Sequence, residues 1–220
     1  MKIAIIGASG KTGIKLVSES LKRGHQVVAI CRTSSADRLK EFADNVGCLV
    51  ITAPVVSDPA TLIQALAGCN AVVAVLISVR RLKATELVRS LAKATAVNGV
   101  KRLVFTAGEV TAVLEKDEAF TLRQRIMLPV FKLIAWVTPF SMTDMIKSSV
   151  LVRQQSEWDW TIVRAPTLDD TPAVGYMLCA ISDITAKHVL SREDYAASML
   201  DSLANPEHYR RTLTLISAER

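Results

Sequence analysis

The sequence lacks the groupings of cysteine and histidine that hold a metal ion. Its four cysteines contain no Cys-x-x-Cys pair and lie at Cys31, Cys48, Cys69 and Cys179. The three histidines have no ligand spacing either, and lie at His25, His188 and His208. Zinc sites need such ligands at short, regular spacings. We therefore predict no metal site, and cysteines that serve as small buried thiols.

The sequence also lacks a long hydrophobic run. Its most apolar later stretch, residues 126–140, contains Pro129, Lys132 and Pro139 and is shorter than a membrane span requires. The apolar run at the start is too short for a secretory signal, and glycines follow it at once. Repeats and low-complexity tracts are missing too. We expect a soluble, cytoplasmic protein in which residues 1–220 form one domain.

Aromatic residues make up only 5% of the chain, and there is no dense basic tract. Lysine and arginine number 27 against 21 aspartates and glutamates, which gives a net charge of +6. These basic residues are spread along the chain, whereas a nucleic-acid surface gathers them together. A solvated surface with a few phosphate contacts explains the excess, and we expect no nucleic-acid partner.

What the sequence does contain is a regular alternation of short apolar runs and helical patterns. The runs are rich in Val and Ile and mostly lack period-two alternation, which is typical of strands buried on both faces. The predicted strands are Ile3–Ile6, Gln26–Cys31, Cys48–Thr52, Ala71–Leu76, Arg102–Thr106, Thr161–Arg164 and Thr212–Ile216. The predicted helices between them are Thr12–Arg23, Ala36–Ala43, Pro59–Ala67 and Ala84–Val97.

Capping signals mark two helix starts. Asp58 precedes Pro59 as an N-cap, and the segment Ser191–Asp194 forms a capping box that opens a last helix ending at about Leu203. Strands that alternate with helices form a parallel sheet with helices on both faces. We predict an α/β fold of the Rossmann type, with a doubly wound, mainly parallel sheet.

The segment Gly7–Gly13, GASGKTG, follows the first predicted strand and resembles two phosphate-binding loops. A P-loop needs its first glycine five residues ahead of the Gly-Lys pair, and that position is Ile5, inside the strand. The spacing that fits is Gly7-x-x-Gly10-x-x-Gly13, which is typical of dinucleotide binding.

Each glycine in this loop has an expected role. Gly7 allows a sharp turn off the strand, Gly10 leaves room for the pyrophosphate, and Gly13 lets the helix lie close to the sheet. The free N–H groups at the start of the helix then face the anion. Lys11 and Thr12 become additional phosphate donors.

The end of the second strand indicates which dinucleotide binds. A unit that prefers NAD tends to place an acidic residue there, to hold the ribose 2′-hydroxyl. This chain has Arg32, then Thr33, Ser34 and Ser35, and then Arg38. A guanidinium and hydroxyls suit a 2′-phosphate, so we predict that NADP(H) is preferred over NAD(H). The alternative is that Arg32 is a solvated loop residue.

Four segments together resemble a known family: KIAIIGASGKTG, CRTSSADR, GVKRLVFTAGE and WDWTIVRAPTLDDTP. The chain is similar to the atypical short-chain dehydrogenase/reductase group with one NAD(P)H-binding domain. That group includes the flavin reductase/biliverdin-IXβ reductase type and the NmrA-like redox sensors. The likeness runs over nearly the whole chain, including the closing VLSREDYAASMLDSLANPEHYRRTLTL.

The resemblance implies a cofactor that lies over the carboxyl ends of the strands. The pyrophosphate would be held by Gly7, Ser9, Gly10, Lys11, Thr12 and Gly13, and the 2′-phosphate by Arg32 and Arg38. The ribose would pass Leu76, Ile77 and Ser78. The nicotinamide end would be approached by Thr106, Ala107, Ala165, Pro166 and Thr167.

Three positions depart from the family pattern. Pro54-Val55 stands where a Gly-Asp pair commonly touches adenine, and Ile77 stands where a glycine often follows the fourth strand. The fifth strand ends in Ala107-Gly108 in place of Ser-Ser or Thr-Ser. The first two changes concern cofactor binding, and the third concerns chemistry.

The Tyr-x-x-x-Lys pair of ordinary short-chain dehydrogenases is absent. Ala180, Met199 and Leu213 stand four residues after Tyr176, Tyr195 and Tyr209. Without this pair, proton exchange with an alcohol or ketone lacks its usual donor. Reduction of a flavin or quinone needs only that the two rings stack and that water is excluded, because solvent can supply the proton.

The acceptor side is expected to come from residues of about 108–144 and 165–190, which would form a lobe. Aromatic side chains there could wall a flat ligand, or could instead form core or a dimer face: Phe120, Phe131, Trp136 and Phe140. Thr106, Glu109 and Lys147 are candidates for a catalytic role, with surface exposure as the alternative for Lys147. Asp144, Arg80 and Arg81 are further polar residues near the expected mouth.

Two functions remain open at this point. The first is an NADPH-dependent reductase of a flavin, a quinone or a similar conjugated acceptor, which would be a small aromatic molecule. The second is a non-catalytic, NmrA-like sensor that binds NADP(H) and changes partners with its redox state. Either protein could be a monomer or a homodimer.

Overall fold

The computed structural model describes residues 1–75, 83–108, 141–179 and 189–218 of the chain. Its strands are β1 (Lys2–Ile6), β2 (Gln26–Arg32), β3 (Cys48–Ala53), β4 (Ala71–Ala74), β5 (Arg102–Gly108), β6 (Asp159–Ala165), β7 (Thr167–Asp169), β8 (Tyr176–Cys179), β9 (Val189–Ser191) and β10 (Arg211–Ser217). Its α-helices are α1 (Lys11–Lys22), α2 (Pro59–Ala65), α3 (Ala84–Asn98), α6 (Met142–Arg153) and α7 (Arg192–Ala204). Two 3-10 helices are η1 (Thr33–Phe42) and η3 (Pro206–His208).

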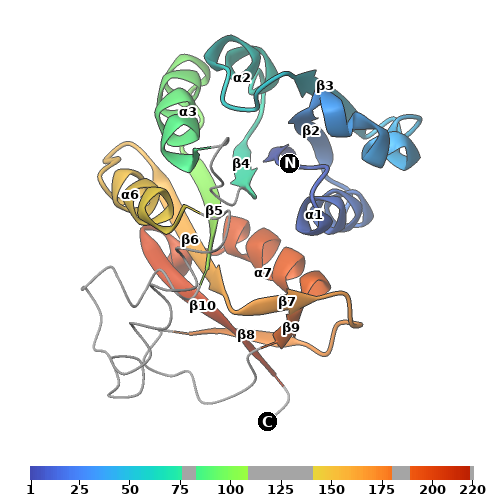
Figure 1. Cartoon of the computed structure of the whole chain (residues 1–220), viewed down its shortest axis with the longest axis vertical. Helices are drawn as coiled ribbons and strands as arrows, with labels where there is room; N and C mark the ends of the chain where they lie inside the picture. Colours follow the sequence, from blue (N-terminus) through green and yellow to red (C-terminus); the bar gives the residue numbers. More distant parts are fainter. Residues whose placement is uncertain (76–82, 109–140, 180–188, 219–220) are drawn as a thin grey trace.

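One sheet organises the molecule (Figure 1). Its strand order is β3-β2-β1-β4-β5-β6-β10-β8, and every pairing is parallel except that of β8 with β10. The chain moves outward in one direction from β1 to β3 and in the other from β4 to β6. Such a reversal leaves a crevice at the carboxyl ends of β1 and β4. The predicted Rossmann-type, mainly parallel sheet is confirmed.

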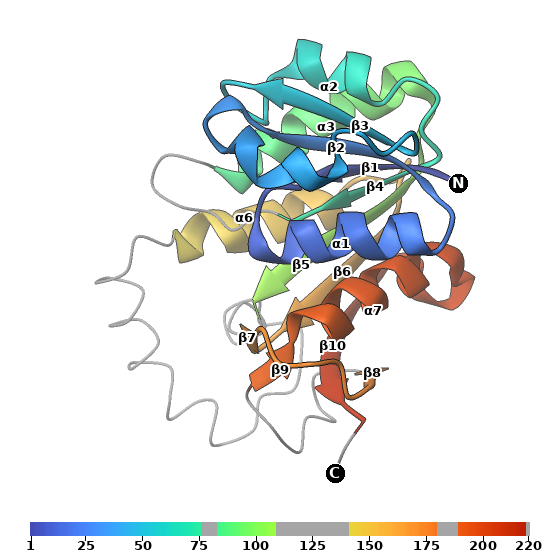
Figure 2. The same ribbon diagram turned by 90° about the vertical axis from the view of Figure 1, so that its right-hand side faces the viewer.

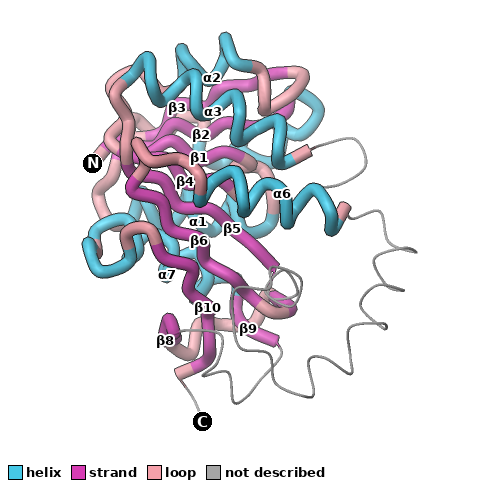
Figure 3. Tube along the Cα trace, turned by 90° about the vertical axis from the view of Figure 1, so that its left-hand side faces the viewer, coloured by secondary structure: helices cyan, strands magenta, loops and turns pink. Residues whose placement is uncertain are grey.

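Helices cover both faces of the sheet. Helices α1 and α7 lie on one face (Figure 2), and α2, α3 and α6 lie on the other (Figure 3). Along β1, Ile3 and Ile5 pack in the core on the α1 side, whereas Ala4 and Ile6 pack on the α3 side. All four are fully buried, because successive side chains point to opposite faces and both faces are covered. This double burial explains the unbroken apolar runs in the sequence.

The capping predictions were right at one helix and partly wrong at another. The Asp58 carboxylate accepts the Thr61 backbone N–H at 2.8 Å, as expected of an N-cap. Ser191 does cap α7, but its Oγ accepts the N–H of Glu193, at 3.1 Å, whereas a capping box would use the N–H of Asp194. The Asp194 carboxylate accepts from Val174 and Gly175 N–H groups at 3.0 and 3.2 Å, so it ties a distant segment to α7.

Three short strands were not predicted. β8 pairs with β10 in the antiparallel direction at the edge of the main sheet. β7 and β9 pair in parallel and form a separate two-stranded unit, which we call the β7–β9 ribbon. The predicted helix Ala36–Ala43 is instead the 3-10 helix η1, which begins directly after β2. No helix in the described part of the chain combines the length and apolarity needed to cross a membrane.

Candidate functional site

The glycine loop joins β1 to α1 and allows an unusually close approach between them. Gly7 has a φ of 81°, which favours glycine. A Cβ atom on Gly13 would lie 2.2 Å from the Gly7 carbonyl oxygen and 2.6 Å from that of Ala8. A Cβ atom on Gly10 would lie 3.2 Å from the Gly7 oxygen. Gly7 and Gly13 therefore have the backbone roles expected from the sequence, a sharp turn and a helix that lies against the strand end.

In the described part of the chain, the amino end of α1 has no side-chain cap. Gly7 and Ala8 donate their N–H groups to the Ile30 carbonyl oxygen at 3.0 and 3.1 Å, which fixes the loop. Within the described residues no side chain caps α1, and its first turn contains no acidic residue. The leading amides of a helix and its dipole favour an anion at this end.

The segment after β2 is joined to this loop through two serines. The hydroxyl oxygens of Ser9 and Ser35 lie 2.8 Å apart, and Ser35 Oγ donates to the Arg32 carbonyl oxygen at 3.1 Å. The side chains of Arg32 and Arg38 are exposed. Two guanidinium groups therefore stand on the segment that adjoins the glycine loop, with no acidic residue between Arg32 and Ala36.

The carboxyl ends of β5 and β6 lie side by side. Ala107 pairs with Arg164 and Gly108 with Ala165 in the parallel register. Beneath them, between the sheet and helices α3 and α6, lies a cleft of about 30 Å³. It is lined by Thr106 and Ala107, among others, and has room for a water molecule or two.

Helix α6 turns different side chains toward the cleft from those expected. Ser148, which the sequence reasoning missed, lines the cleft together with Thr106, and its Oγ donates to the Met145 carbonyl oxygen at 2.7 Å. Lys147 is exposed and lines a groove on the outside of α3 and α6. The structure thus brings Thr106 and Ser148 together and leaves Lys147 on another face of the helix. Helical position relative to the apolar residues of α6 was the only signal for Ser148.

The Asp144 side chain, on α6, caps the start of helix α3. Its buried carboxylate accepts the Ala84 backbone N–H at 2.7 Å and the Thr85 hydroxyl, at the start of α3. The N-cap residue of α3 itself, Lys83, makes no capping hydrogen bond. Asp144 therefore caps a neighbouring helix, whereas the sequence had placed it as a polar residue near the mouth.

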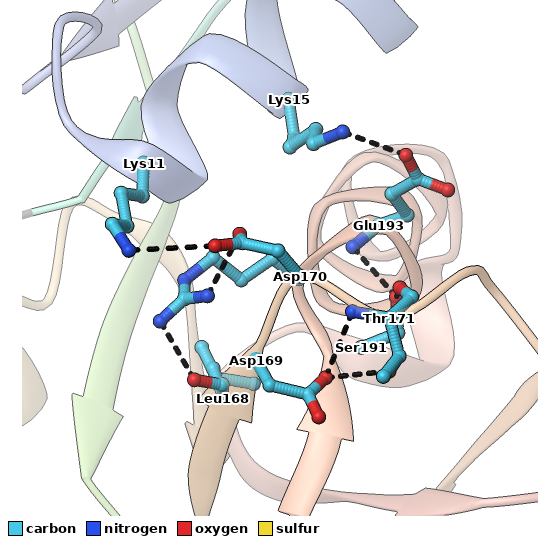
Figure 4. A network of polar contacts seen from close by, with 9 residues as sticks. Lys11, Lys15, Leu168, Asp169, Asp170, Thr171, Ser191 and Glu193 are labelled. Atoms are coloured by element: carbon cyan, nitrogen blue, oxygen red, sulfur yellow. Dashed lines mark hydrogen bonds and ion pairs between the residues drawn. The ribbon is translucent and has the colours of Figure 1, made fainter.

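A polar network crosses from α1 to the β7–β9 ribbon and α7 (Figure 4). Lys11 Nζ lies 3.4 Å from Asp170 Oδ2, and Lys15 Nζ lies 2.7 Å from Glu193 Oε1. Arg192 Nη1 also contacts Asp170, at 2.8 Å. This network brings an acidic residue close to the expected pyrophosphate site.

The remaining predicted residues divide into two groups. Pro166 is half-buried and Thr167 is exposed where β7 begins, and Pro54 and Val55 are exposed after β3. Ten others lie outside the described residues: Leu76, Ile77, Ser78, Arg80, Arg81, Glu109, Phe120, Phe131, Trp136 and Phe140. In the described ranges, no group of three or more His, Cys, Asp or Glu side chains is placed to hold a metal ion.

Comparison with solved structures shows which proteins have a similar fold. A wide-type short-chain dehydrogenase/reductase from Veillonella parvula, in complex with NADP, is 18% identical with a TM-score of 0.80, over 99% of this chain and 95% of that chain. The oxidoreductase ylbE from Lactococcus lactis is 14% identical with a TM-score of 0.73, over 99% of this chain and 91% of that chain. At these identities the likeness establishes the fold alone.

Comparison of sequences identifies the family. The uncharacterized protein YwnB from Bacillus subtilis is 51% identical over 43 residues, so that the match spans 20% of this chain and 20% of that protein. The model of a family described as NAD(P)H-binding matches residues 7–206. With a Rossmann-type sheet, a glycine loop and an uncapped helix at its carboxyl edge, this chain belongs to the NAD(P)H-binding family.

Proposed function

We propose that this protein is an NADPH-dependent reductase of a flavin, a quinone or a similar conjugated acceptor. The observation that carries the proposal is the uncapped amino end of α1, which lies beside an exposed basic segment after β2. The first feature suits a diphosphate and the second suits a 2′-phosphate. The Veillonella parvula protein of the same fold was solved with NADP, which supports the same choice.

The chain's own residues have distinct tasks in this proposal. Gly10, Lys11 and Thr12 hold the diphosphate, and Arg32 and Arg38 hold the 2′-phosphate. Five residues at or just after the ends of β5 and β6 would line the site of the nicotinamide end, namely Thr106, Ala107, Ala165, Pro166 and Thr167. The bound cofactor supplies a hydride to the acceptor ring. Solvent supplies the accompanying proton, so the protein needs no dedicated acid.

Turnover with a panel of acceptors tests the reductase. Purified protein is mixed with NADPH or NADH and with FMN or one of several quinones, and the loss of reduced nicotinamide absorbance is followed. We expect oxidation above the protein-free rate with at least one acceptor, and faster oxidation of NADPH than of NADH. A heat-denatured sample of the same protein controls for bound metal or free flavin.

A second candidate function is a sensor that binds NADP(H) without chemistry. The end of β5 favours the sensor, because the strand ends in Thr106, Ala107 and Gly108 and has no serine pair. The charged candidate Lys147 lies on the outer groove, away from Thr106. Tight binding of both cofactor forms without turnover on any acceptor would favour the sensor over the reductase. A difference in amide hydrogen exchange between the NADPH and NADP⁺ complexes would then be expected.

A further inference from the structure

Lys11 already has an anionic partner in the protein. It is the first residue of α1, and its Nζ lies 3.4 Å from Asp170 Oδ2. Asp170 directly follows β7 and stands 159 residues later in the chain. The carboxylate therefore stands beside one of the side chains proposed to hold the diphosphate (Figure 4).

Asp170 has a second, firmer partner on its other side. Arg192 Nη1 lies 2.8 Å from Asp170 Oδ1, and Arg192 Nη2 donates to the Leu168 carbonyl oxygen at 2.6 Å. The Arg192 side chain is 17% exposed, against 71% for Lys11. The hydrogen bond from Arg192 and, to a smaller degree, that from Lys11 hold the pKa of Asp170 below its ordinary value. Asp170 is thus an anion at neutral pH, fixed by Arg192 and loosely joined to Lys11.

The segment that carries Asp170 does not depend on Lys11 for its position. Ser191 Oγ donates to the Thr171 carbonyl oxygen at 2.7 Å. The Asp194 carboxylate accepts the N–H groups of Val174 and Gly175. Release of Lys11 therefore breaks one exposed ion pair and leaves these anchors and the Arg192 contact in place.

We propose that Asp170 is an internal competitor for Lys11 and so sets the affinity of the cofactor site. In the cofactor-free protein the carboxylate holds the Lys11 ammonium. A bound diphosphate takes over the ammonium, while Arg192 retains Asp170. The inference rests on the proposed function in one respect, namely that the diphosphate lies at the amino end of α1.

Calorimetric titration of NADPH into the full-length protein tests this role. Asp170→Asn removes the competing charge with little change of shape, and we expect NADPH to bind about fivefold more tightly at low salt. The gain should shrink as salt is raised, because both groups are exposed. Glu193→Gln is the matched control, since it removes the same charge from another ion pair with α1. The partner of Glu193 is Lys15, which lies one helical turn after Lys11. We expect this control to shift the affinity by less than about twofold.

A double-mutant cycle separates competition from a general change of charge. Lys11→Met should weaken NADPH binding, and Asp170→Asn should then give no further gain. The proposal is overturned if Asp170→Asn leaves the affinity unchanged or weakens it, if Glu193→Gln gives an equal gain, or if the gain persists with Lys11→Met. No heat with the wild type would refute the proposed function itself. Wild-type binding that Lys11→Met weakens and Asp170→Asn does not alter would refute the competitor role alone.

Discussion

The hydroxyl oxygens of Ser9 and Ser35 lie 2.8 Å apart and join the glycine loop to the segment that carries Arg32. Because Ser35 donates its proton to the Arg32 carbonyl oxygen, Ser9 is the donor to Ser35. The two serines thus fix the spacing between the proposed diphosphate and 2′-phosphate contacts. Ser35 can therefore influence cofactor binding through the positions of Ser9 and Arg32.

Ser35→Ala should weaken NADPH binding by about threefold to tenfold, the range expected for one lost hydrogen bond. NADH should lose less, since it has no 2′-phosphate to be positioned. Calorimetry with both coenzymes measures the difference. Ser156→Ala, an exposed serine in the turn before β6, is the matched control and should change neither affinity. Equal weakening of both coenzymes would show instead that Ser35 acts on the diphosphate loop.

Gly13→Ala should destabilise the fold by about 1–3 kcal/mol, because the new Cβ atom meets backbone that cannot move aside cheaply. That atom would lie 2.2 Å from the Gly7 carbonyl oxygen. The urea midpoint of unfolding measures the change. Gly47→Ala is the control, since its Cβ atom would meet the side chains of Asn45 and Leu21 at 3.2 Å and the His25 carbonyl oxygen at an ordinary contact distance of 3.8 Å. A midpoint for Gly13→Ala equal to that of Gly47→Ala would contradict the close approach.

Asp144→Ala should destabilise the protein by about 1–2 kcal/mol, the usual effect of a lost helix cap. The side chain caps α3 from α6, through the Ala84 N–H and the Thr85 hydroxyl. Asp144→Asn keeps an acceptor and should lose less. Lys147→Ala, an exposed change on the same helix, should leave the urea midpoint unchanged. If Asp144→Ala and Lys147→Ala unfold alike, the cap contributes nothing.

His208, the last residue of η3, is held in its neutral form. Asn205 Nδ2 lies 3.1 Å from His208 Nε2, and His208 Nδ1 lies 3.1 Å from Ser202 Oγ. The Asn205 amide orientation follows from its Oδ1, which accepts the Glu207 N–H. Nε2 therefore accepts a hydrogen bond and Nδ1 carries the proton. Burial, and then the charge of Arg102, lower the pKa of His208 below its ordinary value of 6.5.

Stability should consequently fall as the pH is lowered from about 8 to about 5.5. The unfolded chain takes up a proton near pH 6.5, whereas the folded chain resists it until the lower folded pKa is reached. Urea unfolding across this range measures the slope. His208→Gln should flatten it, although not fully, because burial lowers the pKa of His25 as well. A wild-type midpoint that stays constant or rises as the pH falls would contradict this arrangement.

The main sheet, apart from its edge strand β8, and the glycine loop could be predicted because both are encoded locally. Strands such as β1 and β2 are buried on two faces, and this leaves a continuous apolar run at each. Gly7, Gly10 and Gly13 stand in a fixed spacing directly after such a run. A short window of sequence therefore contains all the information that the loop requires.

What the sequence did not predict depends on contacts between distant segments. Asp144 lies about sixty residues from the helix that it caps, and Asp170 pairs with Lys11 across 159 residues. The strands of the β7–β9 ribbon are three residues long, too short for any period to be recognised. The Asp194 carboxylate accepts the N–H groups of Val174 and Gly175 instead of completing the predicted capping box.

Titration of NADPH and NADH against the wild type and Arg32→Ala tests the central claim most directly. We predict that the wild type binds NADPH at least about tenfold more tightly than NADH, and that Arg32→Ala removes most of this preference while NADH binding persists. Equal affinities in the wild type would contradict selection of the 2′-phosphate by Arg32. No binding of either coenzyme would contradict the cofactor site at the amino end of α1.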